Sequence, residues 1–293
     1  MVDIVGTILS LIVLGLLEGG IYALVALGLT LIFGVAKILN IAHGDLAILG
    51  AYAAFWLFAS YKIDPLLSLI LVLPLLFLIG VVIQKFVVNV AIREARFQTT
   101  ASIMVTYGLA LFISNSETLA WGSDYRSITL SYSYSGFSFY GIVFNLPRIV
   151  VLAATAATMV FFVFFLRTKT GKAVRACAQD REAASLLGID FNKLAVVVFG
   201  ISVAASGLAG VLYLLNHTLF PAEGLQLTVE GLTVMVLGGI GSVEGAFVGG
   251  LLLAIVESVA AYALGNQYRD LMSFLVLILI LFVRPQGLFG KAQ

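Results

Sequence analysis

Long apolar stretches recur along almost the whole chain, and they constrain its fold more than any other feature. A membrane helix needs about 20 mostly apolar residues to cross the hydrocarbon core. A barrel strand would need only about ten, in strict alternation with polar residues, and no segment alternates in that way. The uncharged or nearly uncharged stretches are 4–36, 46–61, 65–84, 99–120, 149–166, 194–216, 225–264 and 271–283. We therefore expect an all-α polytopic protein of the cell (inner) membrane, with about eight hydrophobic spans and residues 1–293 in one transmembrane domain.

The composition supports a membrane protein and excludes several other classes. The chain is 61% hydrophobic and 11% charged, whereas a soluble domain carries roughly 25% charged residues. Its net charge of +1 provides no attraction to nucleic acid. The single cysteine, Cys177, excludes an internal disulfide, and the only two histidines, His43 and His217, are expected on opposite faces. We expect no metal, no cofactor and no enzymatic activity. The first residues also lack a secretory signal, so Met1 is expected to stay in the mature chain.

Two of the apolar stretches are too long for one straight crossing. Residues 4–36 are interrupted by Glu18-Gly19-Gly20, and 225–264 contain Gly238-Gly239-Ile240-Gly241-Ser242. Glycine at membrane depth is tolerated where backbone is buried in protein or lines a polar cavity. The second stretch is predicted to form two shorter helices joined by a glycine break, which could be a re-entrant pair.

The basic residues predict the orientation, because cytoplasmic loops are enriched in lysine and arginine. The richest segment, 167–193, is expected in the cytoplasm. Alternation from this segment assigns twelve of the sixteen basic residues to the cytoplasm. The four left outside are Lys62, Arg126, Arg148 and Arg269. The N-terminus is then outside, and 121–147 is a polar external loop that could hold a short hairpin.

The cytoplasmic segment contains a candidate docking helix. Residues 172–187 are rich in alanine, a strong helix former, and end at Gly188, the residue type expected just after a helix. A short helix with an alanine face and charged flanks can dock into a groove on a partner. The alternative is a helix that rests on lipid headgroups. The absence of Trp and Phe from its apolar side favours docking.

A polar cluster lies between the first two apolar stretches. Asn40, His43 and Asp45 could form a proton relay or a cation site, because ionisable groups near membrane depth are functional candidates. The favoured alternative is a turn in which Asp45 caps the next helix near the cytoplasmic surface. Five glutamates in or beside apolar stretches raise the same question, and most are expected at the membrane interface. They are Glu18, Glu117, Glu230, Glu244 and Glu257.

Glycines recur every four residues in the second long stretch. Gly241, Gly245 and Gly249 would form one flat stripe on a helix, against which another backbone can approach closely. We expect the stripe to pack against a neighbouring helix; a cavity wall is the alternative, since broken helices often occur at transport sites.

Four segments together resemble the permease subunits of branched-chain amino acid ABC importers. They are Leu39–Asp45 with Leu49–Tyr52, Arg175–Ala178 with Leu187–Ile189, Leu237–Ser242 with Gly245–Ala246, and Arg284–Gly290. Glu182-Ala183-Ala184, followed by Gly188, also resembles the loop by which such permeases contact their ATPases. The resemblance implies that six residues couple the permease to its ATPases: Arg175, Asp180, Glu182, Ala183, Ala184 and Gly188. It also implies a role in helix packing or in the pathway for Asn40, His43, Asp45, Gly238, Gly239, Gly241, Gly245 and Gly249.

The resemblance also implies an inward-transporting assembly. It would contain a second permease subunit that is usually a distinct paralogue, two cytoplasmic ATP-binding subunits and an extracytoplasmic substrate-binding protein. Branched-chain or other neutral amino acids are the expected cargo, although permeases for urea and short-chain amides share the motifs. Two other readings remain: an ion-coupled secondary carrier that uses Asp45 or an intramembrane glutamate, and a channel or scaffold.

Overall fold

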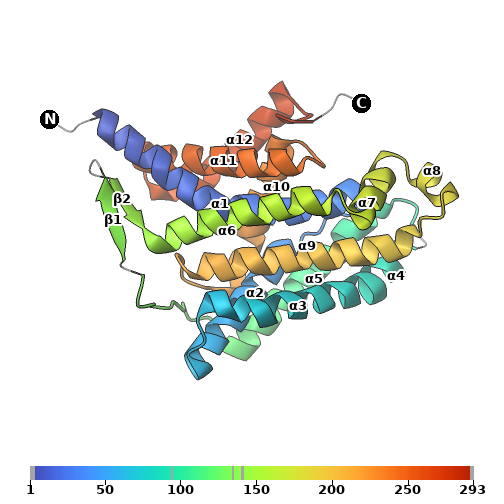
Figure 1. Cartoon of the computed structure of the whole chain (residues 1–293), viewed down its shortest axis with the longest axis horizontal. Coiled ribbons are helices and arrows are strands. Elements are labelled where there is room, and N and C mark those ends of the chain that lie inside the picture. The colour runs from blue at the N-terminus through green and yellow to red at the C-terminus, as the bar shows by residue number, and fades with distance from the viewer. Residues whose placement is uncertain (1–3, 94, 134, 140–141, 291–293) are drawn as a thin grey trace.

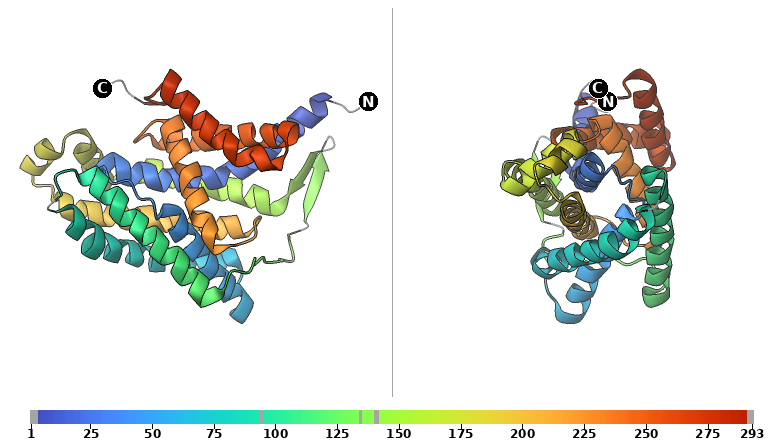
Figure 2. Two further views of the ribbon diagram at one scale, coloured as in Figure 1. Left: turned by 180° about the vertical axis from the view of Figure 1, so that it is seen from behind. Right: turned by 90° about the vertical axis from the view of Figure 1, so that its right-hand side faces the viewer.

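The computed structural model describes residues 4–93, 95–133, 135–139 and 142–290 (Figure 1 and Figure 2). Most of them lie in helices. The long helices are α1 (Ile4–Ala36), α2 (His43–Tyr61), α3 (Pro65–Ile83), α5 (Gln98–Trp121), α6 (Leu146–Phe165), α9 (Phe191–Leu214), α10 (Gly224–Gly238), α11 (Val243–Leu264) and α12 (Arg269–Val283). A π-helical segment, 84–88, joins α3 to the short helix α4 (Asn89–Ile92), and α7 (Lys169–Gln179) and α8 (Arg181–Leu186) form the segment before α9.

Seven helical segments among the described residues are long and apolar enough to cross a membrane. They are 6–36, 43–61, 65–92, 146–165, 191–214, 243–264 and 266–283. Helix α10 has only 15 residues and is too short to cross by itself, while α5 carries many hydroxyl and amide side chains. The all-α polytopic prediction is confirmed. Stretch 225–264 divides into α10 and α11 at the glycine break, as predicted.

The expected interruption of the first stretch is not present, because α1 is one continuous helix of 33 residues. Its glycines serve close packing instead. A Cβ atom on Gly19 would lie 2.7 Å from the Leu251 Cα of α11, and one on Gly15 would lie 2.7 Å from the Ile255 Cα. Glycine at these positions lets the backbones of α1 and α11 touch, as small residues do at helix contacts in membranes.

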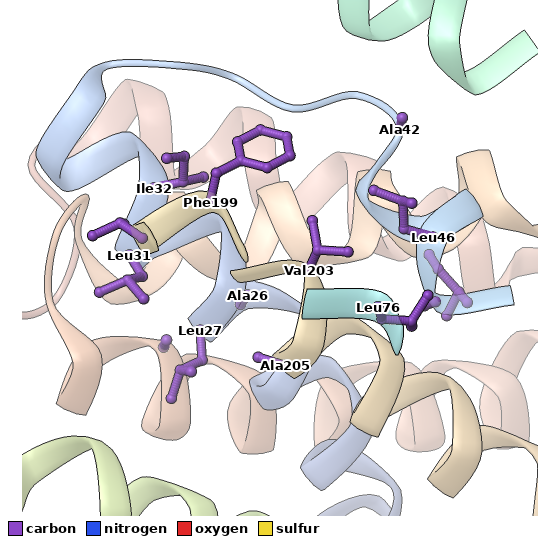
Figure 3. Packing of buried hydrophobic residues seen from close by; sticks show 14 of the residues in the cluster. Ala26, Leu27, Leu31, Ile32, Ala42, Leu46, Leu76, Phe199, Val203 and Ala205 are labelled. Carbon is purple, nitrogen blue, oxygen red and sulfur yellow. The ribbon is translucent and has the colours of Figure 1, made fainter. Parts of the chain in front are cut away.

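The main hydrophobic core lies where α1, α2, α3 and α9 meet (Figure 3). Leu27 and Ile32 of α1, Leu46 of α2, Leu76 of α3 and Phe199 of α9 are each at most 3% exposed. Figure 3 also shows the unwound segment that leads from α1 to Ala42. The Ala42 residue is fully buried. Helix α1 is thus surrounded by protein along much of its length and fixes the other helices around it.

The two ends of the bundle differ in character. In Figure 1, α4, α7 and α8 gather at one end, while the N-terminus and the hairpin of β1 (Gly136–Phe139) and β2 (Ile142–Asn145) lie at the other. The two strands pair antiparallel, with Gly136 opposite Asn145. This confirms the hairpin within 121–147. The arrangement also agrees with the predicted orientation, since the Lys/Arg-rich segments share one end; we use cytoplasmic and external for the two ends.

Candidate functional site

A break in the helical structure lies deep inside the bundle between α1 and α2. The chain leaves α1 at Lys37, which has a positive φ of 55°, and residues 37–42, the first break, lie outside the helices. The His43 ring lies against Gly28. Gly28 precedes the end of α1 by eight residues, or roughly 12 Å of helix at about 1.5 Å per residue. The first break therefore returns into the bundle before α2 begins.

Hydroxyl groups from two other helices satisfy the backbone of the first break. Thr106 of α5 accepts a hydrogen bond from the Ile41 N–H at 3.0 Å and donates to the Leu39 carbonyl at 3.0 Å. Thr228 of α10 accepts from the Gly44 N–H at 2.8 Å and donates to the Ile41 carbonyl at 2.9 Å. At membrane depth an unpaired backbone group costs several kcal/mol. The two threonines therefore allow an unwound segment to exist there.

The first turns of α2 and α10 meet backbone to backbone beside the first break. A Cβ atom on Gly44 would clash with the Gly224 carbonyl, and one on Gly224 would clash with the Asp45 side chain. Residues 215–223 lead into α10 from the external side, and Leu219, fully buried, pairs with Arg126 of the external loop. Two connecting segments, one from each end of the bundle, thus approach each other in its interior.

The same region holds buried polar side chains that lack partners. Asn40, His43, Asp45 and Glu117 are each at most 2% exposed. The Asn40 amide, both His43 nitrogens, Asp45 Oδ2 and both Glu117 oxygens have no hydrogen-bond partner among the described residues. Most buried polar groups in proteins are paired, so an unpaired cluster needs an explanation. These residues are the strongest candidates for a functional polar centre inside the bundle.

The expected capping role of Asp45 is wrong. Helix α2 begins at His43 after Ala42, and no side chain caps its N-terminus. Asp45 lies in the first turn, 2% exposed, and faces Gly224 rather than the cytoplasmic surface. The prediction of a cap assumes that α2 starts at the membrane surface. In the structure α2 starts within the bundle.

A second break, residues 239–242, separates α10 from α11 and has a different construction. Gly239 and Gly241 have φ values of 103° and 87°, which favour glycine. Ser242 caps α11 by accepting a hydrogen bond from the Gly245 N–H at 2.9 Å. The C-terminal segment packs onto this turn, since the Leu288 and Phe289 N–H groups donate to the Leu237 and Gly238 carbonyls. Two motif segments distant in sequence therefore form one structural unit.

The predicted glycine stripe is only partly present. Gly245 and Gly249 lie in α11 and pack against the backbone of α10 at Gly238. Gly241 lies in the second break and not on the helix, so it is not part of the stripe. Gly250 adds a contact on another side of α11, where a Cβ atom would lie 2.6 Å from the Ala23 nitrogen of α1. The packing interpretation thus agrees with the positions of Gly245 and Gly249.

A polar cavity of about 260 Å³ opens at the external end, between α1, α9, α10 and α12. Its walls combine acidic, basic, aromatic and apolar side chains. They are Glu18, Ile21, Tyr22, Tyr213, His217, Glu223, Gln226, Leu227, Glu230, Asn266, Arg269 and Asp270. The sequence had singled out Glu18 and Glu230 only as isolated glutamates. Their convergence depends on the fold, so no local pattern could have indicated it.

Two ion pairs involve residues of the cavity wall. Arg148 Nη2 lies 3.1 Å from Glu18 Oε1, and Arg269 Nε lies 3.0 Å from Glu257 Oε2. Arg269 also donates to the Tyr22 hydroxyl at 2.8 Å, and that hydroxyl donates to Glu257 at 2.7 Å. Burial lowers the pKa of His217, so its ring is neutral near pH 7 although it faces Glu18. Arg148 is then the charged partner of Glu18.

The cytoplasmic segment is not the single helix expected over 172–187. Helix α7 ends at Gln179, and Asp180 has an extended backbone with φ −151° and ψ 109°. Its carboxylate accepts hydrogen bonds from the Glu182 and Ala183 N–H groups and so caps a separate helix, α8. Aspartate is a favoured N-cap residue, so Asp180 is a local signal for a new helix start within 172–187. The end at Gly188 is confirmed, with φ 82°.

The two helices of this segment present different surfaces. Val174 and Cys177 attach α7 to the bundle and are 3% and 5% exposed. On α8, Ala184 is buried, so it packs within the chain, whereas Ala183 is exposed. Leu186 and Leu187 are 88% and 81% exposed at the tip. The candidate docking surface therefore consists of Ala183, Leu186, Leu187 and Gly188, in place of a long alanine face.

Comparison with known proteins agrees with this architecture. The sequence pattern of the family described as branched-chain amino acid transport system / permease component matches residues 11–281. The high-affinity branched-chain amino acid transport system permease protein BraD of Pseudomonas aeruginosa is 32% identical, over 97% of this chain and 96% of its own. The corresponding LivH of Escherichia coli K12 is 30% identical, over 95% and 94%. LivM of Salmonella typhimurium is 25% identical, over 93% of this chain and 68% of its own.

Among solved structures, PsaBC from Streptococcus pneumoniae in complex with Fab aligns with 93% of this chain and 91% of its own chain, with a TM-score of 0.47 and 12% identity. The family match and the two relatives at 30% identity or more each extend over nearly the whole chain. They confirm the resemblance seen in the four sequence segments. The chain therefore belongs to the permease components of branched-chain amino acid transport systems, as a multi-pass membrane protein.

Proposed function

We propose that this chain is one permease subunit of an ABC importer that carries branched-chain amino acids inward. Two cytoplasmic ATPases would supply the energy, and an external binding protein would deliver the solute. The second permease would be a distinct paralogue. LivH and LivM of Salmonella typhimurium are two differently named permease proteins, and they are 30% and 25% identical to this chain, which supports a pair of unlike subunits.

The observation that carries the proposal is the exposed tip of α8. Leucines exposed to 88% and 81% at a cytoplasmic end are unfavourable in water, and they follow Glu182 and Ala183 in the segment that resembles an ATPase contact. Helix α7 links this tip to α1 and α9 through its buried face. A movement imposed on α8 by an ATPase would thus reach the helices that surround the first break.

The docking surface can be tested with paired variants of the reconstituted importer. Leu186→Glu with Leu187→Glu should leave insertion and folding intact, because both side chains project away from the bundle. ATPase co-purification and leucine uptake should both fall by tenfold or more. The matched control is Ser185→Ala, which removes only a hydrogen bond to the Glu182 carbonyl and should transport as wild type. Normal uptake by the double glutamate variant would exclude α8 as the docking element.

Gly188 provides a second test of the same surface. Its φ of 82° disfavours any side chain, and tryptophan would add bulk beside the two leucines. Gly188→Trp should still insert but should uncouple ATP hydrolysis from uptake. Uptake at the wild-type rate, with normal expression, would show that this position does not face an ATPase.

An ion-coupled carrier remains a second candidate because of one observation. Asp45 and Glu117 are buried carboxyl groups with unpaired oxygens, and such groups can serve proton or cation coupling. A carrier would move its solute along an ion gradient without ATPases, which separates the two functions.

A further inference from the structure

We propose that the external cavity is a binding site for a zwitterionic amino acid, whose ammonium group is held by Glu230. The inference rests on the proposed function and deepens it, because it assigns a site to the solute on this chain. It is carried by the balance of charges, by the burial of Glu230 and by the chemical variety of the walls.

The cavity walls hold more carboxyl groups than basic side chains after the ion pairs are accounted for. Glu18 is paired with Arg148, and Glu257 is paired with Arg269. Three carboxylates then remain in the walls: Glu223, Glu230 and Asp270. None of the three has a cationic group within ion-pair distance among the described residues. Acidic side chains without a paired basic group, set in low-dielectric walls, favour a cationic ligand over an anionic one.

Glu230 is the carboxylate that most needs a cationic partner. It is 6% exposed and yet lines the cavity. Its one recorded hydrogen bond is a long one, from the Gln226 amide at 3.3 Å. Gln226 also donates to Asp270 at 2.9 Å, so this amide is shared. Burying a carboxylate without a counterion is costly. An ammonium group that enters the cavity would supply the missing partner.

The remaining walls suit the other parts of an amino acid. Arg269 lines the cavity, and its contacts with Glu257 and Tyr22 leave further guanidinium N–H donors for a carboxylate. Ile21 and Leu227 form an apolar part of the wall. The volume of about 260 Å³ is close to the lower limit of small-molecule sites, about 300 Å³. A simple metal cation would use the carboxylates but would gain nothing from the arginine or the apolar wall.

The first test measures the electrostatics and occupancy of the cavity without relying on transport. In the full importer with Cys177→Ala, Asn266→Cys places a single thiol in the cavity wall. Membrane-impermeant methanethiosulfonates of opposite charge are then compared. The cationic reagent should react faster by on the order of tenfold, and Glu230→Gln should remove most of this preference. Ser127→Cys, in the external loop, is the control thiol and should show little preference. Leucine delivered by the binding protein should slow labelling of Asn266→Cys.

The second test measures function in proteoliposomes that contain the complete importer. Glu230→Gln should lower the maximal rate of leucine uptake about tenfold while binding-protein-stimulated ATP hydrolysis persists, and Glu230→Asp should recover part of the uptake. Asp124→Asn, an exposed external carboxylate outside the cavity, should transport normally. If Glu230→Gln fails to fold, the proposal is tested by Asn266→Cys with Glu230 intact. The measured quantities are then the preference for the cationic reagent and the protection from labelling by leucine.

Several results would overturn the proposal. Equal labelling by the two reagents, or labelling unaffected by leucine, would show that the cavity does not hold the solute. Leucine uptake by Glu230→Gln at the wild-type rate would also show that Glu230 does not hold the solute. Loss of binding-protein-stimulated ATP hydrolysis would indicate that the acidic cavity docks the binding protein instead. If the wild-type importer moves no amino acid at all, the proposed function fails, whereas the charge preference still reports on the cavity itself.

Discussion

The two breaks in the helical structure are built in opposite ways. In the second break, residues 239–242, the partners are backbone groups and one capping serine, and none of its buried side-chain atoms is unpaired among the described residues. In the first break, residues 37–42, the partners are the hydroxyls of Thr106 and Thr228 on distant helices, and Asn40 remains unpaired at full burial.

This difference bears on how easily each break can change its partners. A glycine turn completed by backbone and a cap is a stable way to reverse a helix. A buried, unwound segment held by two side chains from α5 and α10 would change its hydrogen-bond partners if those helices shifted. Broken helices with polar neighbours near the middle of the membrane are typical of transport sites. We infer that the first break belongs to the pathway and that the second supports it.

The largest losses of folded protein are expected for substitutions at glycines where two backbones touch. Such losses should occur near both breaks. Gly44→Leu places a side chain against the Gly224 carbonyl, and Gly245→Leu places one against Gly238. Neither backbone can retreat, so both variants should lose most folded protein. Gly108→Leu is the matched control, because nothing lies within 4 Å of a Cβ atom there. Membrane expression and monodispersity in detergent measure the outcome. Normal assembly of Gly245→Leu would show that α10 and α11 are not packed as described.

A smaller effect, which should distinguish the breaks, is expected for Thr228→Val. The change preserves shape but leaves the Gly44 N–H and the Ile41 carbonyl without their hydroxyl partner. Each unsatisfied buried group costs about 1–3 kcal/mol. Thermal unfolding in detergent should therefore occur at a clearly lower temperature, and uptake should fall. Thr228→Ser retains the hydroxyl and should restore both. Equal stability of the valine variant would mean that water or another group can replace this hydroxyl.

The smallest effect is expected for Ser242→Ala in the second break. It removes one N-cap, which typically costs about 1 kcal/mol, from a turn that glycine geometry and the C-terminal segment also hold. Stability should decrease slightly, and the uptake rate per folded molecule should stay near wild type. A large loss of uptake at normal stability would contradict the supporting role of the second break and remove the contrast between the two.

The sequence predicted those features that depend on local chemistry. Apolar stretches located the helices, Gly239 located the division of 225–264, and Gly188 marked a helix end. The failures have two causes. From sequence Gly19 predicts an interruption, because a packing glycine and a helix-breaking glycine have the same local pattern. Asp45 predicts a cap, because the sequence does not indicate how deep in the bundle α2 begins. Glu230 and Arg269 line one cavity only through the fold, so no local pattern indicates the cavity.

The central claim is that ATP, rather than an ion gradient through Asp45, drives transport by this chain. The most direct measurement is leucine uptake by proteoliposomes that contain both permeases, the ATPases and the binding protein, with wild-type Asp45 or Asp45→Asn. The account predicts uptake that requires ATP, that persists when the proton and sodium gradients are collapsed, and that survives in the asparagine variant. Uptake driven by an ion gradient without ATPases, and abolished by Asp45→Asn in folded protein, would contradict it.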